Sequence, residues 1–173
     1  MGKASDLSGA PGEPTDEFPF PVPTYLFHLF TTIARLRDTR LDKALKPLGL
    51  NVTRHRAIAV IALLEPCTMS ELADFSAIDR TTMTRIVDQL VARGQAQRAI
   101  PDADRRQVMI TLTDQGQSVY RAALKIIAEA NRNALKGVPD DLLRAMTRAE
   151  QLILVNLSLN AEHARRLLVF KRE

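Results

Sequence analysis

Two clusters of arginine and short polar side chains suggest the chemistry of this sequence. The first cluster comprises Arg80, Thr81, Thr82, Thr84, Arg85 and Gln89. The second comprises Asp104, Arg105 and Arg106. A guanidinium group forms paired hydrogen bonds with phosphates and base edges, and a carboxylate beside it orients those donors. Both clusters therefore predict contacts with duplex DNA, with an ordinary solvent-exposed charged surface as the alternative for each.

The first cluster lies on a helix predicted over about residues 80–93, the second helix of a helix–turn–helix. One face of this helix is apolar, with Met83, Ile86, Val87, Leu90 and Val91 at helical spacing. Most of the polar residues lie on the opposite face. Such a helix enters a major groove with its N-terminal residues near the bases. Asp88 is unfavourable beside phosphates, so we expect it to pair with a nearby arginine.

The second cluster lies in a loop between two extended segments, residues 95–100 and 107–112. In the second segment Val108, Ile110 and Leu112 alternate with other side chains, the pattern of a half-buried strand. The polar loop between the segments predicts a hairpin. Arginines at its tip reach an adjacent minor groove or its phosphates. Hairpin and helix–turn–helix together form the arrangement of a winged helix-turn-helix.

Helices are predicted on both sides of this winged region. Helical spacing predicts a first helix from about residue 24 that ends at Pro47 and Gly49, and a second from Thr53 to Glu65. Thr113 caps a long helix to about residue 136, and a last helix starts near Pro139. The fold class is therefore mainly α (α+β). We expect a DNA-binding lobe over residues 51–112, with its wing over about 95–112, and a helical dimerisation region over residues 24–50 and 113–173.

The last helix is apolar nearly all round over residues 152–159, which is too apolar for a helix with one solvated face. A second copy of the chain is the simplest cover for this surface, which predicts a homodimer. Two recognition helices about 34 Å apart would match a palindromic DNA site. Residues 1–23 contain five of the nine prolines and have a net charge of −3, so we expect a flexible arm outside the core.

Composition excludes several classes of protein. The chain has 173 residues, one Cys and no Trp, and 18 of its 24 cationic residues are Arg. No apolar run is long enough to span a membrane and no signal peptide opens the chain, so we expect a cytoplasmic protein without membrane contact. The sequence also shows no nucleophile–base set, phosphate-binding Gly loop or metal-ligand spacing. We therefore predict that the protein is not an enzyme and needs no metal and no cofactor.

Several segments of this sequence resemble the MarR family of transcriptional regulators. Residues 102–116 are similar to its wing signature, an Asp-x-Arg followed by a strand and Leu-Thr-x-x-Gly. Residues 48–50, 70–73, 84–90 and 93–94 are also similar to the family's pattern, and the resemblance spans roughly residues 24–160. It implies that the helix of residues 80–93 enters the major groove and that the terminal helices form the dimer interface. It also implies that Arg106 is the minor-groove residue at the wing tip, with Asp104 supporting it.

The resemblance further implies a small effector, aromatic or anionic, bound between the dimerisation region and the DNA-binding lobe. His28, His55 and Arg56 are the candidate effector-binding residues, because they can hydrogen-bond a phenol or a carboxylate. Surface charge or an interhelical hydrogen bond is the alternative for each. The sequence thus predicts a ligand-responsive transcriptional regulator, a repressor, bound to palindromic double-stranded DNA as a homodimer and released by an aromatic or acyl-CoA-type effector.

Two alternatives to this function stay open at the level of sequence. Cys67 would allow a thiol-based redox sensor, as in some relatives, although it follows Pro66 instead of lying in the first helix. A winged helix can also serve as a protein-interaction module that does not bind DNA. The arginines of the predicted wing argue against that second alternative.

Overall fold

The computed structural model describes residues 21–76, 78–100, 107–158, 164, 165 and 168. The chain divides into two compact units, residues 1–37 and 38–173. The first unit contains most of helix α1 (Val22–Leu45), up to residue 37. There Phe27 and Phe30 form an edge-to-face pair with ring centroids 6.0 Å apart. Val22, Phe27, Ile33 and Leu36 leave much of their apolar surface exposed.

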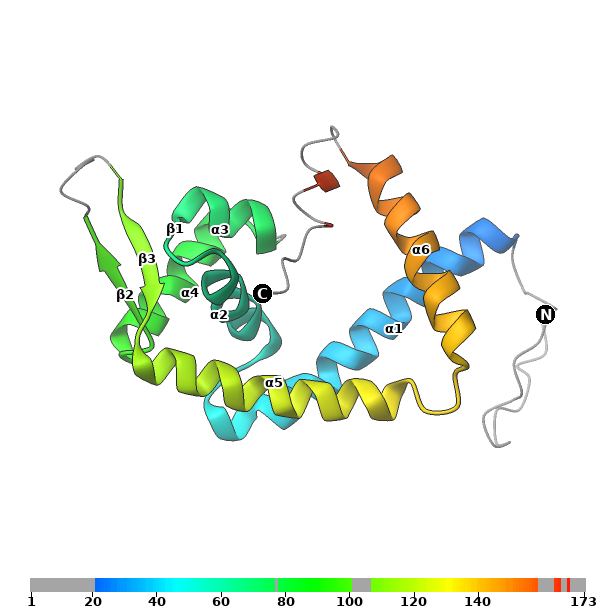
Figure 1. The fold of residues 1–173 in the computed structure, drawn as a ribbon, viewed down its shortest axis with the longest axis horizontal. Coiled ribbons are helices and arrows are strands. Elements are labelled where there is room, and N and C mark those ends of the chain that lie inside the picture. The colour runs from blue at the N-terminus through cyan, green and yellow to red at the C-terminus, as the bar shows by residue number, and fades with distance from the viewer. Residues whose placement is uncertain (1–20, 77, 101–106, 159–163, 166–167, 169–173) are drawn as a thin grey trace, which may run out of the picture. The chain divides into compact units, whose positions relative to one another are not determined.

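The second unit contains the end of α1 and all the other elements. They follow in the order η1 (Lys46–Leu48), α2 (Val52–Leu64), β1 (Cys67–Thr68), α3 (Met69–Ser76), α4 (Arg80–Ala92), β2 (Ala96–Ala99), β3 (Met109–Leu112), α5 (Asp114–Ala134) and α6 (Asp140–Leu157). Figure 1 shows α2, α3 and α4 grouped beside the strands, with α5 continuing from β3. The fold is mainly helical with one small sheet, which confirms the predicted class.

The sheet has three antiparallel strands in the order β1-β3-β2. Ala96 pairs with Leu112 across β2 and β3, as the hairpin predicts. Ile110 and Leu112 are buried, in agreement with the alternation seen in the sequence. Val108, the third residue of that pattern, precedes β3 and is exposed. The first strand was not predicted, because two residues are too short to show a period. It joins the sheet through the pairing of Cys67 with Ile110.

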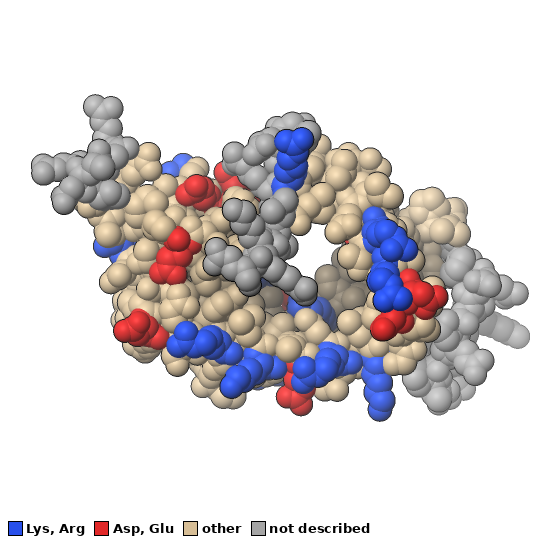
Figure 2. All heavy atoms as spheres, viewed as in Figure 1, with Lys and Arg blue, Asp and Glu red and all other residues tan. Residues whose placement is uncertain are grey.

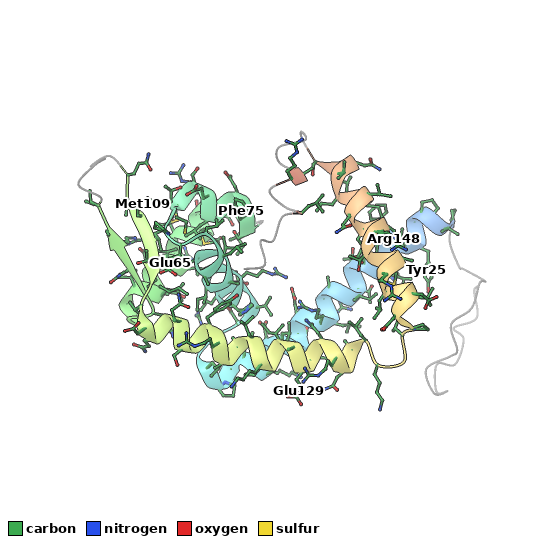
Figure 3. All side chains as sticks on the ribbon, in the orientation of Figure 1. Tyr25, Glu65, Phe75, Met109, Glu129 and Arg148 are labelled. Carbon is green, nitrogen blue, oxygen red and sulfur yellow. The ribbon has the colours of Figure 1, made fainter. Side chains whose placement is uncertain are left out.

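The core of the second unit lies between α2, α3, α4 and the sheet. Its largest fully buried side chains are Leu41, Leu45, Ile58, Ile61, Leu72, Met83, Val87, Leu90, Cys67 and Ile110. Glu65, at the end of α2, ties three elements together (Figure 3). Its Oε1 accepts a hydrogen bond from the Leu112 N–H at 2.8 Å, and its Oε2 accepts one from Gln117 Nε2 at 2.9 Å. The base of the wing is therefore anchored to α2 and α5.

Most helix ends lie where local signals predict them, with one correction at α2. Asn51 is the N-cap instead of Thr53, because Asn51 Oδ1 accepts a hydrogen bond from the Arg54 N–H at 2.9 Å. Thr113 caps α5 as predicted, since its Oγ1 accepts from the Gly116 N–H at 3.1 Å. Gly94 has a positive φ of 67° just after α4, the place where a helix-ending glycine is expected.

Helix α6 differs from the other long helices of its unit because none of its residues is buried. Its large exposed side chains are Leu142, Met146, Leu152, Val155 and Leu157. Leu152 and Leu157 keep 67% and 69% of their surface accessible. No helix in the described part of the chain has the length and apolar character needed to cross a membrane.

Candidate nucleic-acid interface

In the helix–turn–helix, side chains at the start of α3 and in the turn after it bind free backbone N–H groups. At the start of α3, Thr68 and Glu71 form a reciprocal pair: the Thr68 N–H donates to Glu71 Oε2 at 2.8 Å, and Thr68 Oγ1 accepts from the Glu71 N–H at 3.3 Å. In the turn, Ser76 Oγ accepts from the Ile78 N–H at 3.3 Å. Ala77, between the two helices, lies outside the described residues. These contacts satisfy free backbone N–H groups before and after α3.

Asp79 is the N-cap of α4. Its Oδ1 accepts a hydrogen bond from the Thr82 N–H at 2.9 Å. Hydrogen bonds from the Thr82 side chain and backbone lower the pKa of Asp79 below its usual value, so the carboxylate is charged at neutral pH. The helix therefore starts at Arg80, within the predicted range.

The first turns of α4 present a polar, cationic surface to solvent. Its exposed residues are Arg80, Thr81, Thr82, Thr84 and Arg85, all of them predicted DNA contacts. Met83 and Val87, on the other side of the helix, are completely buried. Thr84 Oγ1 donates to the Arg80 carbonyl at 2.9 Å, which leaves its oxygen free to accept from a base edge. The two arginines can thus reach a ligand while the opposite side of the helix stays packed against the core.

Gln89, the sixth predicted contact on α4, is placed differently. It is half-buried, and its Oε1 accepts a hydrogen bond from Arg54 Nε at 3.0 Å. It lies on the third turn of the helix, next to the N-terminal turn of α2. Its side-chain oxygen is therefore engaged within the protein, and its amide N–H groups are what it can offer to a base.

Asp88 pairs with an arginine, as the sequence analysis expects. Arg98 Nη2, on strand β2, lies 2.7 Å from Asp88 Oδ1. The carboxylate is neutralised at the place where a phosphate backbone would otherwise meet a negative charge. The pair also joins the wing strand to the recognition helix.

The tip of the wing, residues 101–106, lies outside the described residues, and with it Asp104, Arg105 and Arg106. The strands that lead to this loop are described and are held in register by Ala99 opposite Met109. Figure 3 labels Met109 near the outer end of β3. The roles of the three loop residues therefore stay predictions.

The comparison with protein families bears directly on this arrangement. A model described as "MarR family" matches residues 48–107, the stretch that contains α2, α3, α4 and β2. Residues 48–107 of this chain are thus similar to the MarR family. The resemblance to that family is confirmed over this stretch, which contains the helix motifs and the first part of the wing signature. Because the relatives in this family are transcriptional regulators and not enzymes, the expectation that this chain has no enzymatic activity is confirmed as well.

Two curated relatives illustrate the extent of the similarity. The multiple antibiotic resistance protein MarR of Escherichia coli K12 is 24% identical over 104 residues, covering 60% of this chain and 72% of its own. The transcriptional repressor MprA of Escherichia coli K12 is 35% identical over 93 residues, covering 53% of this chain and 52% of its own. Both alignments therefore span only part of this chain.

Two solved structures share the fold. One is a mutant MarR from E. coli complexed with operator DNA, with a TM-score of 0.70 and 21% identity, covering 80% of this chain and 99% of that one. The other is CouR from Rhodococcus jostii RHA1 bound to p-coumaroyl-CoA, with a TM-score of 0.70 and 22% identity, covering 81% of this chain and 99% of that one. At these identities the likeness establishes the winged-helix fold.

The three residues predicted to bind an effector lie in different settings. His28 is on the exposed side of α1 in the first unit, where its ring stacks with Tyr25 at a centroid distance of 6.3 Å. His55 and Arg56 are on α2 in the second unit. The His55 ring stacks with that of Tyr120 on α5 at 6.4 Å. Arg56 Nη2 lies 2.8 Å from Asp38 Oδ2, so its guanidinium already holds a carboxylate of the protein.

Cys67 offers poor chemistry for a redox sensor. Its side chain is completely buried, and Sγ lies 3.7 Å from the Ile110 carbonyl oxygen. Burial, together with the charges of Glu71 and Glu65, raises the pKa of the Cys67 thiol to about 12. Since the thiolate is the reactive form, this environment disfavours reaction of the thiol at neutral pH. Among the described residues, no group of three or more His, Cys, Asp or Glu side chains could hold a metal ion.

Cationic side chains are not confined to the recognition helix. Arg121, Lys125 and Arg132 are exposed on α5, and Lys136 is exposed in the turn after it. Figure 2 shows a row of cationic side chains where α5 runs in Figure 1. Glu129 interrupts this row (Figure 3). The density of cations therefore does not by itself distinguish α4. What distinguishes α4 is that its arginines project beside small hydroxyl side chains on one exposed face.

Sequence reasoning missed two further arginines near this helix. Arg54 Nη1 and Arg93 Nη1 both donate to the Gly49 carbonyl, at 3.1 and 2.8 Å. They come from the start of α2 and the end of α4. The sequence contains no signal for this convergence, because the three residues share no motif and are brought together only by helix packing.

Proposed function

We propose that this MarR-family regulator is a repressor that binds palindromic duplex DNA as a homodimer. The observation that supports this best is the exposed N-terminal half of α4, where Arg80 and Arg85 flank three threonines. A helix of this composition fits a major groove, with bidentate arginine contacts to guanine and hydroxyl contacts to bases or phosphates. The structural relative whose title names operator DNA, and the curated relative named as a repressor, support the same proposal.

In this proposal the residues of α4 and the wing have distinct roles. Arg85, with Thr81 and Thr84, contacts base edges, while Arg80 and Thr82 at the first turn contact phosphates. Gln89 contributes its amide N–H groups. Arg105 and Arg106 of the wing enter the adjacent minor groove or hold its phosphates, with Asp104 orienting them. Arg98 supports both parts through its ion pair with Asp88.

The homodimer is supported by the apolar surface of the terminal helices. The described part of α6 buries none of its residues, and Leu152 and Leu157 are each about two-thirds exposed. In the other unit, Val22 and Ile33 of α1 are more than half exposed. Exposed apolar surfaces of this kind mark interaction sites, and a second copy of the chain is the partner that we propose for them. We assign residues 24–50 and 113–173 to this dimerisation region, with residues 1–23 as an arm outside it.

We further propose a small effector that alters the spacing of the two DNA-binding lobes and releases DNA. The structural relative whose title names p-coumaroyl-CoA supports an aromatic or acyl-CoA-type ligand. Of the three candidate residues, His55 stacks with the aromatic ring of Tyr120. A planar ligand would add a third ring to this stack. Arg56 would have to exchange Asp38 for a ligand carboxylate. The regulator would act where the chromosome lies, in the cytoplasm.

A selection experiment tests the DNA-binding proposal without knowledge of the operator. The full chain is incubated with a random duplex library and the bound fraction is sequenced, with Arg85→Ala as the comparison. We expect enrichment of a two-fold symmetric motif by the native chain and a changed or lost motif with the variant. Failure of the native chain to enrich any motif at low salt contradicts the proposal and favours a protein-interaction module.

Sedimentation tests the dimer. At micromolar concentration the native chain is expected to sediment at about twice its 19.3 kDa mass. Leu152→Asp combined with Val155→Asp should give a monomer, because two charges cannot be buried without partners. Ser118→Asp, an exposed polar position on α5, is the control and should remain dimeric. A native chain that sediments as a monomer contradicts the dimer.

A further inference from the structure

We infer that Arg54 and Arg93 form a binding site for a small oxyanion, a phosphate or carboxylate group, at the junction of η1, α2 and α4. Both guanidinium groups donate to one acceptor, the carbonyl of Gly49, at 3.1 and 2.8 Å. Their Nη1 atoms therefore cannot lie farther apart than these two hydrogen bonds together. Two full positive charges are held side by side by a neutral group.

The carbonyl compensates this charge only in part. Gly49 follows η1, and a carbonyl at the end of a helix bears at most about half a negative charge. Among the described residues neither guanidinium forms an ion pair with a carboxylate. Asp42, on the last turn of α1, instead accepts a hydrogen bond from the Val52 N–H at 2.7 Å. Most of the positive charge of the pair is thus left for an external anion.

The two side chains keep the donors that such an anion needs. A guanidinium group has five N–H donors. Arg54 uses one at Gly49 and one at Gln89 Oε1, and Arg93 uses one at Gly49. The remaining donors of both groups can bind oxyanion oxygens while the Gly49 contacts stay in place. Because Arg54 is half-buried and Arg93 is exposed, the site is open to solvent on one side and partly desolvated on the other.

The arrangement is also restrained before any ligand binds, which favours binding. Arg54 is fixed at its backbone, where its N–H donates to Asn51 Oδ1 at 2.9 Å, and at its tip by Gln89. Gly49 has a φ of 68°, and a Cβ atom there would lie 2.8 Å from Arg93 Nη1. A side chain at position 49 would therefore occupy the space in which Arg93 approaches the carbonyl.

A free small anion is favoured over a DNA phosphate as the occupant. Arg93 lies thirteen residues beyond Arg80, which places it about 20 Å along α4 from the end that we propose to enter the groove. A phosphate contacted by the first turn of α4 is therefore out of reach of Arg93 at the other end of the helix. The ligand class is therefore a phosphate or carboxylate of low molecular mass.

Thermal unfolding of the full chain in sodium phosphate, compared with sodium chloride at equal ionic strength and pH 7, tests this site. Phosphate also stabilises proteins by exclusion from their surface, an effect that all variants share. We expect a saturable rise in Tm for the native chain, weakened at least five-fold in apparent affinity in Arg93→Gln and Arg54→Gln. Arg93→Lys should retain most of the rise because it keeps the charge, and Arg148→Gln on α6 should behave as the native chain.

Two results would overturn the inference. One is an equal rise in Tm for the native chain and Arg93→Gln, which shows that phosphate acts only by exclusion. The other is no saturable rise in the native chain together with a loss of about one unit in the salt slope of DNA binding for Arg93→Gln, which assigns the pair to a DNA phosphate. If Arg54→Gln fails to fold, the exposed Arg93 variants decide the matter. The thermal measurement uses no DNA, so its outcome is independent of the proposed function.

Discussion

The Arg98 guanidinium lies 2.7 Å from the Asp88 carboxylate and so connects the first wing strand to the recognition helix. Asp88 is the one acidic residue within α4, and its pairing removes a charge that would repel a phosphate backbone. The same ion pair is a direct contact between strand β2 and α4. Both effects predict a contribution to DNA binding from residues that do not themselves touch DNA.

Arg98→Ala should therefore weaken DNA binding with little loss of stability. The pair is partly solvent-exposed, and surface ion pairs contribute less than about 1 kcal/mol to folding. Affinity is measured by fluorescence anisotropy with the selected motif, and stability by urea unfolding. The double variant Arg98→Ala, Asp88→Asn should recover part of the affinity, because it removes the unpaired carboxylate. No recovery would show that Arg98 contacts DNA directly.

Arg85→Ala should lower affinity for the selected motif by about 1–3 kcal/mol and relax base preference at one position in each half-site. The reason is the loss of a bidentate contact with a base edge. Competition with single-base variants of the motif measures this preference. Arg148→Ala, an exposed arginine on α6, is the matched control and should change neither value. A uniform loss across all DNA sequences would identify Arg85 as a phosphate contact.

Arg106→Ala tests the wing. We expect weaker binding and a decrease of about one unit in the slope of log affinity against log salt, since one phosphate contact releases about 0.9 counterions. Titrations at several salt concentrations give the slope. Lys136→Ala, at an exposed position in the turn after α5, serves as the control for a general loss of positive charge. An unchanged affinity for Arg106→Ala contradicts the assignment of this residue to the wing contact.

Gly116→Ala should destabilise the protein although it replaces a glycine inside a helix. By helix propensity the change would stabilise by about 0.5–1 kcal/mol. A Cβ atom at Gly116 would, however, collide with the backbone carbonyl of Gln95, which cannot move as a flexible side chain can. Urea unfolding should therefore show a loss of about 1–3 kcal/mol, the range typical of overpacked core sites. A gain in stability would show that α5 can move away from the base of the wing.

Cys67 should resist alkylation and peroxide in the native protein. Burial raises the pKa of its thiol to about 12, so the neutral form dominates at every pH at which the protein is handled. The stabilisation from keeping this thiol neutral is complete below the unfolded pKa of about 8.5 and is lost as pH rises toward the folded value. Mass spectrometry after iodoacetamide treatment at pH 8 should show labelling only when urea is added. Rapid labelling without urea would restore the redox-sensor alternative.

Local signals were sufficient for the elements whose causes are local. Gly94 ends α4 and Thr113 starts α5, because a helix end depends on the residues within one turn of it. The apolar face of α4 and the alternation in β3 depend only on helical and strand periods. The family motifs follow the same elements, so the fold class and the recognition helix were within reach of the sequence.

Contacts between distant segments required the tertiary structure. Gln89 is equivalent to its polar neighbours on a helical projection, yet Arg54, 35 residues away, binds its oxygen. Cys67 has no local mark of burial, and strand β1 exists only because β3 pairs with it. The convergence of Arg54 and Arg93 on Gly49 has the same origin. Periodicity tells which side of a helix is polar, but only the packing of one element against another decides which polar groups are already satisfied and which are left for a ligand.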